Sequence, residues 1–545
     1  MAPVHLVHSH AHEENLPGTV NLKASDGDDT AYGQALYPVP AEDPNDPLQW
    51  SPTKKNLILL ACSLYSFLGN CATLGPSVYI KLYAEEFGVS PTVASDLVSY
   101  PNLAFGFGSL ILVPLYLKIG RRPVMLGSMV LFCAGLIGAS QATTFGGLMA
   151  ARIVHGFGAG VCEALPVQLV NDIFFLHERG KRIGYYTVAL CFGSTGPLYA
   201  GYMLAGGYSW QLFFYVVFAF AVALLIFTFF VVEETAYKRN NDVSLSPSNT
   251  ISSDPLTSDK PTNQHQETIQ PSTIPADTEQ APTTPPRKPF LQTLHLWSTI
   301  DHSQEFWIMI PRSLTYFLVP QVLWVITSFG IYIGLGALAF NYTFPLKITA
   351  PPYSWSQTNS GLITIATFLG FLLAMPFLSS SDRLAAHLTR KNNGIREAEM
   401  RLGVMLPAML IAPAGIVLYG LAAERDLHWI AYFVGVGMDQ WGALFYFSFT
   451  LAYAVDSYAA NTSEMLIAMN LGKQAISFGM GIYLLDWVLE HGFGVTIAGI
   501  FAGVLLANNL VLVVFMVCGK RVRVFMAGTW LARLHRGTIK KVEVA

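Results

Sequence analysis

The sequence predicts an all-α membrane protein of twelve transmembrane helices in two six-helix bundles. Only 12% of its 545 residues are charged and 52% are hydrophobic, whereas about 25% of residues are charged in a soluble globular protein. Twelve apolar runs are long enough for the roughly 20 helical residues that cross a bilayer. A polar segment in the middle of the chain separates six of these runs from the other six.

The apolar runs are expected to be helices because backbone groups in hydrocarbon need hydrogen-bond partners within their own segment. Lys and Arg are concentrated in every second connection between the runs, that is, on one side of the membrane, for example at Lys54, Arg121 and Arg182. The positive-inside rule therefore places both termini and the middle segment in the cytosol. The predicted spans are 57–79, 94–117, 124–142, 147–170, 184–205, 211–232, 317–341, 359–379, 402–422, 428–454, 463–487 and 494–518.

Polar segments lie before, between and after the two bundles. The first tail contains a histidine-rich stretch, for which a disordered segment is favoured over a metal-binding tract. Residues 240–289 are rich in Ser, Thr and Pro and hold too few large apolar residues to fold. The stretch after them predicts a helix, either on the inner membrane interface or packed on the bundle. The predicted divisions are a cytosolic tail at 1–56, bundles at 57–232 and 317–518, a cytosolic linker at 233–316 and a tail at 519–545.

Several classes of function have no support in the sequence. The six cysteines lie in apolar runs and form no CxxC pair, which favours buried thiols over a zinc site or a disulfide framework. The chain has no GxxxxGK[ST], HExxH or GxSxG motif. A net charge of −3 gives no signal for nucleic acid. We therefore expect neither an enzyme nor a protein with a cofactor or a metal.

Four motifs in a fixed order carry a family resemblance. KIGRRPVML (118–126) follows the second predicted span, and ARIVHGFGAG (151–160) lies in the fourth. TGPLYAG (195–201) lies in the fifth, and YAVDSYAANTSEM (453–465) joins the tenth to the eleventh. Together they resemble the major facilitator superfamily, and most closely its fungal twelve-span drug:proton antiporters.

The resemblance implies a secondary active transporter that works as a monomer in the bilayer. The favoured function is proton-coupled efflux of a small organic compound, a drug or a secondary metabolite. Proton-coupled uptake of a cationic nutrient such as a polyamine is an alternative, and a non-transporting membrane receptor is another. The plasma membrane is the favoured location, with the vacuolar membrane as the alternative.

The fifth predicted span is rich in residues that allow helices to approach and bend. Glycine removes the side chain that would keep two backbones apart, and Pro197 removes an intrahelical hydrogen bond. Family position favours a hinge or a tight interface between the halves over ordinary close packing. The residues assigned to this role are Gly193, Gly196, Pro197 and Gly201.

The fourth predicted span carries two ionisable residues, Arg152 and Glu163, eleven positions apart. On one continuous helix they would lie about 20° apart around the axis, on a common stripe. Arg152 resembles the proton-relay arginine of the family, and burial would favour a protonated Glu163. A fixed salt bridge that holds the bundle together is the alternative.

The tenth predicted span places Asp439 and Gln440 in its outer half, followed at heptad spacing by Tyr446 and Tyr453. An acid beside aromatic rings suits a cationic or amphipathic substrate, and an aromatic packing seam is the alternative. Asp439 is a third candidate for proton coupling. Two residues of the first span are added to the candidate substrate cavity, namely Tyr65 and Asn70.

Charged residues at the inner ends of the spans predict a gate. The turn after the second span keeps Gly120, Arg121 and Arg122, but Leu117 stands where the family usually has an aspartate. The turn is therefore expected to pair with other acids, with Asp172 or Glu178 as candidates. Asp456 is also assigned to the gate, with Arg383 or Lys473 as its expected partner.

One of two glycosylation sequons is predicted to be accessible. Asn341 begins Asn-Tyr-Thr near the predicted outer face, whereas Asn461 lies on the inner side. Only the outer sequon is therefore a candidate for glycosylation.

Overall fold

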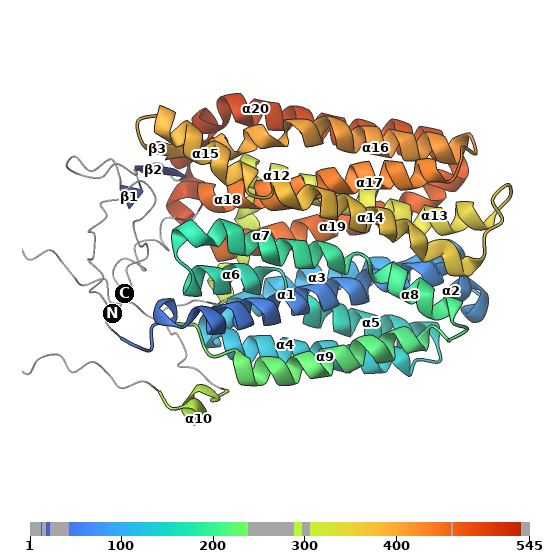
Figure 1. Cartoon of the computed structure of the whole chain (residues 1–545), viewed down its shortest axis with the longest axis horizontal. Coiled ribbons are helices and arrows are strands. Elements are labelled where there is room, and N and C mark those ends of the chain that lie inside the picture. Colours follow the sequence, from blue (N-terminus) through green and yellow to red (C-terminus); the bar gives the residue numbers. More distant parts are fainter. Residues whose placement is uncertain are drawn as a thin grey trace, which may run out of the picture.

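A computed structural model describes residues 12–13, 18–21, 43–237, 288–296, 306–458 and 462–535. It shows two stacked groups of long helices that run in the same general direction (Figure 1). One group is formed by the N-terminal part of the chain and is called the N-terminal half. The other is formed by the C-terminal part and is called the C-terminal half. The all-α fold predicted from the sequence is confirmed.

The N-terminal half begins where the sequence offers helix caps. Ser51 accepts a hydrogen bond from the backbone of Lys54, and a proline occupies the first helical position after it. The same Ser-Pro arrangement starts α3, and Thr144 caps α5. The elements of this half are η2 (Pro47–Gln49), α1 (Pro52–Leu74), η3 (Gly75–Tyr79), α2 (Ile80–Phe87), α3 (Pro91–Ile119), α4 (Arg121–Ser140), α5 (Phe145–Ala159), α6 (Ala164–Ile173), α7 (Leu176–Gly193), α8 (Gly196–Ala205) and α9 (Gln211–Val231).

The C-terminal half contains π-helical turns at η5, η9 and η11, in which the helix accommodates an extra residue. The short helix α10 (Phe290–Thr293) lies on the side of the N-terminal half, where the carbonyl of Thr293 accepts a hydrogen bond from Arg122 (Figure 1). The elements of the C-terminal half are α11 (Phe306–Thr315), η4 (Tyr316–Leu318), α12 (Pro320–Ile331), η5 (Tyr332–Leu338), α13 (Ala339–Thr349), η6 (Gln357–Leu362), α14 (Ile363–Ala374), η7 (Met375–Phe377), α15 (Ser380–Lys391), η8 (Ala398–Met405), α16 (Leu406–Glu424), α17 (Ile430–Phe445), η9 (Tyr446–Thr450), α18 (Leu451–Ser457), α19 (Thr462–His491), η11 (Gly494–Phe501) and α20 (Ala502–Ala527).

Within the residues that the structure describes, nine helical segments are long and apolar enough to cross a membrane. The other three predicted spans are helical as well, in α7 with α8, α17 to α18, and α19. The helices extend beyond the predicted spans: α1 starts five residues before the predicted 57, the eighth span continues to Lys391, and α20 runs to Ala527. Polar and charged side chains continue these helices beyond the hydrocarbon, where an apolar pattern gives no signal.

The first tail is more ordered than expected at two short stretches. β1 (His12–Glu13) pairs with β2 (Thr19–Asn21), and β2 pairs with β3 (Ile395–Glu397), all antiparallel. The remainder of the histidine-rich stretch and the Ser/Thr/Pro-rich stretch 240–287 lie outside the described residues. Of the predicted interfacial helix, the described parts are α10 and α11, and Trp307 on α11 is 80% exposed.

The two halves meet along a seam. On one side of it α3 packs against α19, and on the other side α7 packs against α14 and α8 packs against both α14 and η6. Polar contacts cross this seam at three levels. Ser463 donates to Gln168 at 2.9 Å, Asn470 donates to Ser109 at 3.2 Å, and Thr92 donates to Asp486 at 2.9 Å. The halves are therefore in contact along their length.

Candidate functional site

An ion pair joins the two halves in the interior of the seam. Glu163 lies in the turn between α5 and α6, and its carboxylate accepts a short hydrogen bond from the ammonium of Lys473 on α19. Glu163 is 9% exposed and Lys473 is 3% exposed. The hydroxyl of Tyr186 donates to the backbone carbonyl of Glu163 at 2.8 Å and fixes the turn. Because a buried charge is costly unless it is paired, each partner depends on the other.

The predicted stripe on the fourth span is wrong. The helix is interrupted after Ala159 and resumes at Ala164, so Arg152 and Glu163 do not share one continuous helical face. Arg152 is fully buried in the N-terminal half and donates to backbone carbonyls, including that of Leu97 and, at 2.9 Å, that of Thr73. Its guanidinium lies 5.7 Å from the centre of the Phe214 ring.

A second buried acid lies on the other side of the seam. Asp439 of α17 is fully buried, and one carboxylate oxygen accepts a hydrogen bond from Gln440 at 2.8 Å. The other oxygen has no hydrogen-bond partner among the described residues. A Cβ atom on Gly336 would lie 2.9 Å from the carboxylate, so the glycine leaves space beside the acid. Unlike Glu163, Asp439 has no basic partner in the described part of the chain.

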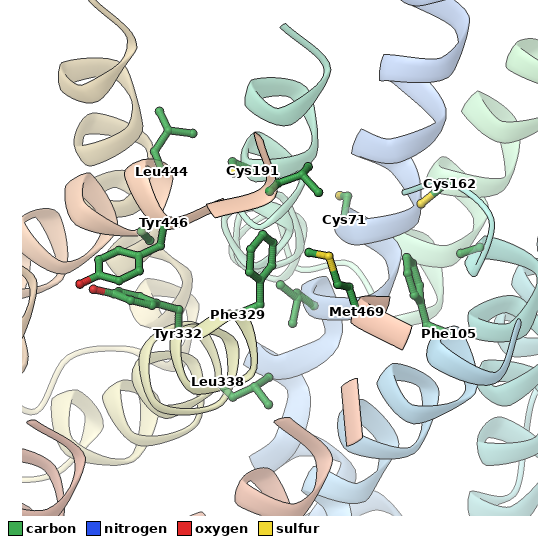
Figure 2. Packing of buried hydrophobic residues seen from close by; sticks show 14 of the residues in the cluster. Cys71, Phe105, Cys162, Cys191, Phe329, Tyr332, Leu338, Leu444, Tyr446 and Met469 are labelled. Carbon is green, nitrogen blue, oxygen red and sulfur yellow. The ribbon is translucent and has the colours of Figure 1, made fainter. Parts of the chain in front are cut away.

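Two tyrosine rings contact each other near this acid, with their planes tilted by 39°. The ring centres of Tyr332 and Tyr446 are 4.3 Å apart, and Figure 2 shows the rings lying side by side with Phe329 and Met469 further along the seam. Tyr446 donates to Asn509 of α20, whereas the hydroxyl of Tyr332 has no partner among the described residues. Asp439 and Tyr446 are both fully buried, and their assignment to proton coupling and to a substrate cavity stays a prediction.

A small pocket lies between the halves and reaches Gln440. Its walls come from the break between α7 and α8 and from α13, α14 and α17, so both halves contribute. Gln440 therefore contacts the acid on one side and the pocket on the other. The lining residues are Ser194, Phe340, Asn341, Ile363, Thr367, Val436 and Gln440.

Four other residues predicted for the substrate cavity are not among the residues that line this pocket, namely Tyr65, Asn70, Tyr446 and Tyr453. Tyr65 donates to Gly158 at 2.9 Å and packs inside the N-terminal half. Asn70 donates to the carbonyl of Leu190 at 2.9 Å and so ties α1 to α7. Tyr453 is displaced because the π-helical turn η9 breaks the heptad spacing that placed it under Tyr446.

The sequon at Asn341 is also in an unexpected place. Asn341 lies inside α13, is 7% exposed and lines the pocket, whereas the sequence predicted it near the outer face at the end of the seventh span. The predicted end of the seventh span was too early, because α13 continues to Thr349.

The glycines of the fifth span make two kinds of contact. Ser194 and Thr195 separate α7 from α8, and Pro197 follows at the start of α8. A Cβ atom on Gly196 would lie 2.5 Å from the carbonyl oxygen of Cys71, so this contact is internal to the N-terminal half. Gly193 likewise approaches α1 closely.

The contact between the halves in this region is made by Pro197 and Gly201. A Cβ atom on Gly361 of η6 would lie 2.3 Å from the carbonyl oxygen of Pro197, and one on Gly201 would lie 3.3 Å from the Cα of Gly361. The tight interface that the sequence predicts is therefore present at these two residues, while Gly193 and Gly196 serve packing within one half.

Charged residues cluster at the predicted cytosolic end of the N-terminal half. Gly120 has a φ of 107° between α3 and α4, and Arg121 pairs with Asp172 at 3.1 Å. Glu234 accepts hydrogen bonds from the backbone of Arg121 at 3.0 Å and of Arg122 at 3.2 Å. Of the two predicted acids, Asp172 is the partner. Glu178 lies instead 3.8 Å from Arg182.

A matching cluster closes the same end of the C-terminal half. Asp456 of α18 accepts from Arg401 at 2.5 Å and from Arg396 at 3.2 Å, and Arg401 also pairs with Asp382 at 2.5 Å. The predicted partners Arg383 and Lys473 were wrong. The arginines that bind Asp456 lie on β3 and η8, in the connection between the eighth and ninth spans, which sequence spacing alone does not bring near α18.

Lys473 was expected to pair with Asp456, but it pairs with Glu163. A lysine in the middle of an apolar run is an intramembrane charge, and such residues are functional candidates by default. The signal was present, but the partner on α5–α6 could not be identified without knowing that α3 and α6 face α19. No group of three or more His, Cys, Asp or Glu that could hold a metal occurs in the part of the chain that the structure describes.

Comparison with known proteins gives a consistent result. A family model described as Major Facilitator Superfamily matches residues 58–482. MFS transporter fsa7 of a Fusarium species is 28% identical over 431 residues, which cover 79% of this chain and 77% of that protein. Protein HOL1 of Saccharomyces cerevisiae is 24% identical over 544 residues, with 88% and 91% covered.

Solved structures agree in fold. The proton:xylose symporter XylE aligns with a TM-score of 0.54 at 14% identity, covering 86% of this chain and 96% of that one. The human organic anion transporter MFSD10 aligns with a TM-score of 0.53 at 15% identity, covering 85% and 100%.

Proposed function

Because this chain belongs to the major facilitator superfamily, and is therefore a multi-pass membrane transporter and not an enzyme, we propose that it exports a small organic compound in exchange for protons. The observation that supports this most is Asp439, a fully buried acid without a basic partner in the described chain, beside a pocket lined by both halves. We place the transporter in the plasma membrane.

In this proposal Asp439 alternates between a protonated and a charged state. A buried carboxyl without a basic partner is more stable when it is protonated. Opening the pocket to water on one side favours loss of the proton, and the charged form then binds a cationic or amphipathic substrate. Gln440 connects the two events, because it donates to Asp439 and lines the pocket.

Glu163 has a different part in the proposed cycle. Its pairing with Lys473 joins the halves, so a proton on Glu163 would remove the attraction and allow the halves to separate. Separation of the seam on one side and closure on the other is the rocking motion by which two-bundle transporters expose a central site alternately.

Uptake of a cationic nutrient is the second candidate, and one observation favours it. The adjacent rings of Tyr332 and Tyr446 lie near Asp439, and aromatic faces with a carboxylate attract organic cations. In that case the substrate itself would neutralise Asp439. A membrane receptor that does not transport is a third candidate, and it would not require Asp439 to titrate.

The test uses the purified full-length chain in proteoliposomes with an imposed pH gradient. A panel of labelled lipophilic organic cations and a labelled polyamine are the probes. We expect proton-driven movement of a lipophilic probe opposite to the proton flux, with loss of this movement in Asp439→Asn. Glu490→Gln is the matched control, because Glu490 is an exposed acid with a side chain 74% accessible.

The outcomes separate the candidates. Asp439→Asn transporting like the wild type would contradict the proton-site proposal. Movement of the polyamine with the proton flux would replace efflux by uptake. Absence of gradient-driven movement for every probe would favour the receptor.

A further inference from the structure

The N-terminal tail adds a strand to the C-terminal half. Val20 of β2 stands opposite Arg396 of β3 in an antiparallel register, and Thr19 stands opposite Glu397. The amide of Ala398 donates to the carbonyl of Gly18 at 3.2 Å and extends the pairing by one residue. Figure 1 shows these strands beside α15 at the end of the molecule where α18 and α20 finish.

Gly18 fits closely into the charged cluster at this end. Its φ is 80°, and a Cβ atom there would lie 2.9 Å from the Cα of Ser457 and 3.0 Å from Arg523. The hydroxyl of Thr19 accepts a hydrogen bond from Arg523 at 3.2 Å. A side chain at position 18 would be opposed both by its backbone conformation and by its neighbours.

The cluster under the strand joins three elements. Arg523 of α20 pairs with Glu399 of η8 at 2.6 Å, and Asp456 of α18 binds arginines of β3 and η8. The strand covers this cluster and touches α18 and α20 at once. It therefore fixes the ends of the ninth, tenth and twelfth spans relative to each other.

The same tail continues to the other half. Asp43 accepts a hydrogen bond from the hydroxyl of Tyr237 at 2.9 Å, and Lys55 donates to the carbonyl of Leu48 at 2.9 Å. Residues 43–50 thus lie on the N-terminal half, whereas residues 18–21 lie on the C-terminal half. One segment of chain contacts both.

We propose that residues 18–21 form an autoinhibitory strap, which holds the predicted cytosolic ends of the ninth, tenth and twelfth spans in their present arrangement and must leave β3 before these ends rearrange. The strap rests on the proposed function in one respect, because only a protein that rearranges this end has something to inhibit. Its presence and its restraint can both be measured without a substrate.

The first test asks whether the strand pairs in register. Asn21→Cys with Ile395→Cys places two thiols on residues that the register puts opposite each other, in a background with Cys518→Ser. We expect rapid disulfide formation in membranes of the full chain. The control pair, Asn21→Cys with Lys391→Cys, should form little disulfide because Lys391 lies in α15 outside the sheet. Equal formation in both pairs would overturn the proposal.

The second test unseats the strap and measures how exposed the cluster beneath it becomes. Gly18→Val combines an unfavourable φ with a steric clash, whereas Gly207→Val has a similar φ of 77° and nothing within 4 Å. Ser457→Cys places the reporter thiol at a fully buried position. When Gly18→Val is added, we expect this thiol to react with a thiol reagent roughly tenfold faster, the factor that corresponds to about 1.4 kcal/mol. Thr19→Val, which removes only the hydroxyl, should give a smaller increase.

The consequence for the halves is measured at a different place. Gln168→Cys and Ser463→Cys replace side chains that bond across the seam at 2.9 Å. Cross-linking of this pair by a short bifunctional thiol reagent should be several-fold slower in Gly18→Val than in Gly207→Val. Unchanged labelling at position 457 would show that no strap is seated. Faster labelling with unchanged cross-linking would show that the strap restrains nothing. Neither result depends on a substrate or on a proton gradient.

Discussion

The pair of Glu163 and Lys473 makes a quantitative prediction about the seam. Both side chains are almost fully buried, and they lie on opposite halves. Glu163→Gln leaves the ammonium without its carboxylate, and Lys473→Met leaves the carboxylate without its ammonium. Removing one partner of a buried pair typically destabilises a protein by about 3–5 kcal/mol, whereas replacing both is often close to neutral.

The magnitude depends on the geometry of this particular site. Among the described residues, no second charged side chain lies within ion-pair distance of either partner. No other ion pair therefore compensates the remaining charge when one partner is replaced. Each single variant is therefore expected to fall at the upper part of that range, unless the remaining group becomes neutral. The double variant Glu163→Gln/Lys473→Met should recover most of the stability.

The assay is thermal unfolding of the full chain in detergent, followed by the reactivity of the buried thiols. Cys162 and Cys191 report on the region because both are buried near Glu163. Asp486→Asn is the control, since Asp486 makes an exposed hydrogen bond across the same seam. If the double variant were as unstable as the sum of the two single variants, the pair would not interact in the way the structure indicates.

Three other predictions concern single contacts, all measured by thermal unfolding. Gly196→Ala should destabilise the protein by about 1–3 kcal/mol because the new methyl group meets a carbonyl of α1 at 2.5 Å, whereas Gly184→Ala, with nothing within 4 Å, should be neutral or slightly stabilising. Arg152→Met should cost about 1–3 kcal/mol, since buried carbonyls of α1 and α3 lose their donor. Tyr446→Phe should cost about 1 kcal/mol by removing the hydrogen bond to Asn509, and equal stability would contradict that bond.

The sequence predicted the helices well because hydropathy and Lys/Arg asymmetry are properties of each span alone. It failed where helices are interrupted. The turn after Ala159 separates Arg152 from Glu163, and the π-helical turn after Phe445 displaces Tyr453. Neither irregularity changes the composition of its span, so a model of continuous helices places the side chains on the wrong faces.

Candidate residues were predicted better than their partners. Asp439, Gln440 and Glu163 were selected because ionisable or amide side chains are rare in apolar runs, and all three lie in or beside the seam. Pairings such as Asp456 with Arg401 depend on contacts between elements distant in sequence. The seating of β2 on β3 depends on a tail whose composition suggests no structure at all.

The meeting of Pro197 with Gly361 has a consequence for how this molecule can diversify. The contact is made by the carbonyl oxygen of Pro197 and the backbone of Gly361, so no change of side-chain rotamer adjusts it. A methyl group on Gly361 would lie 2.3 Å from that oxygen and would force the two halves apart at that level. The close approach of the halves at this level therefore does not involve the side chains of the neighbouring pocket, and we expect the pocket-lining residues to be exchangeable without changing it.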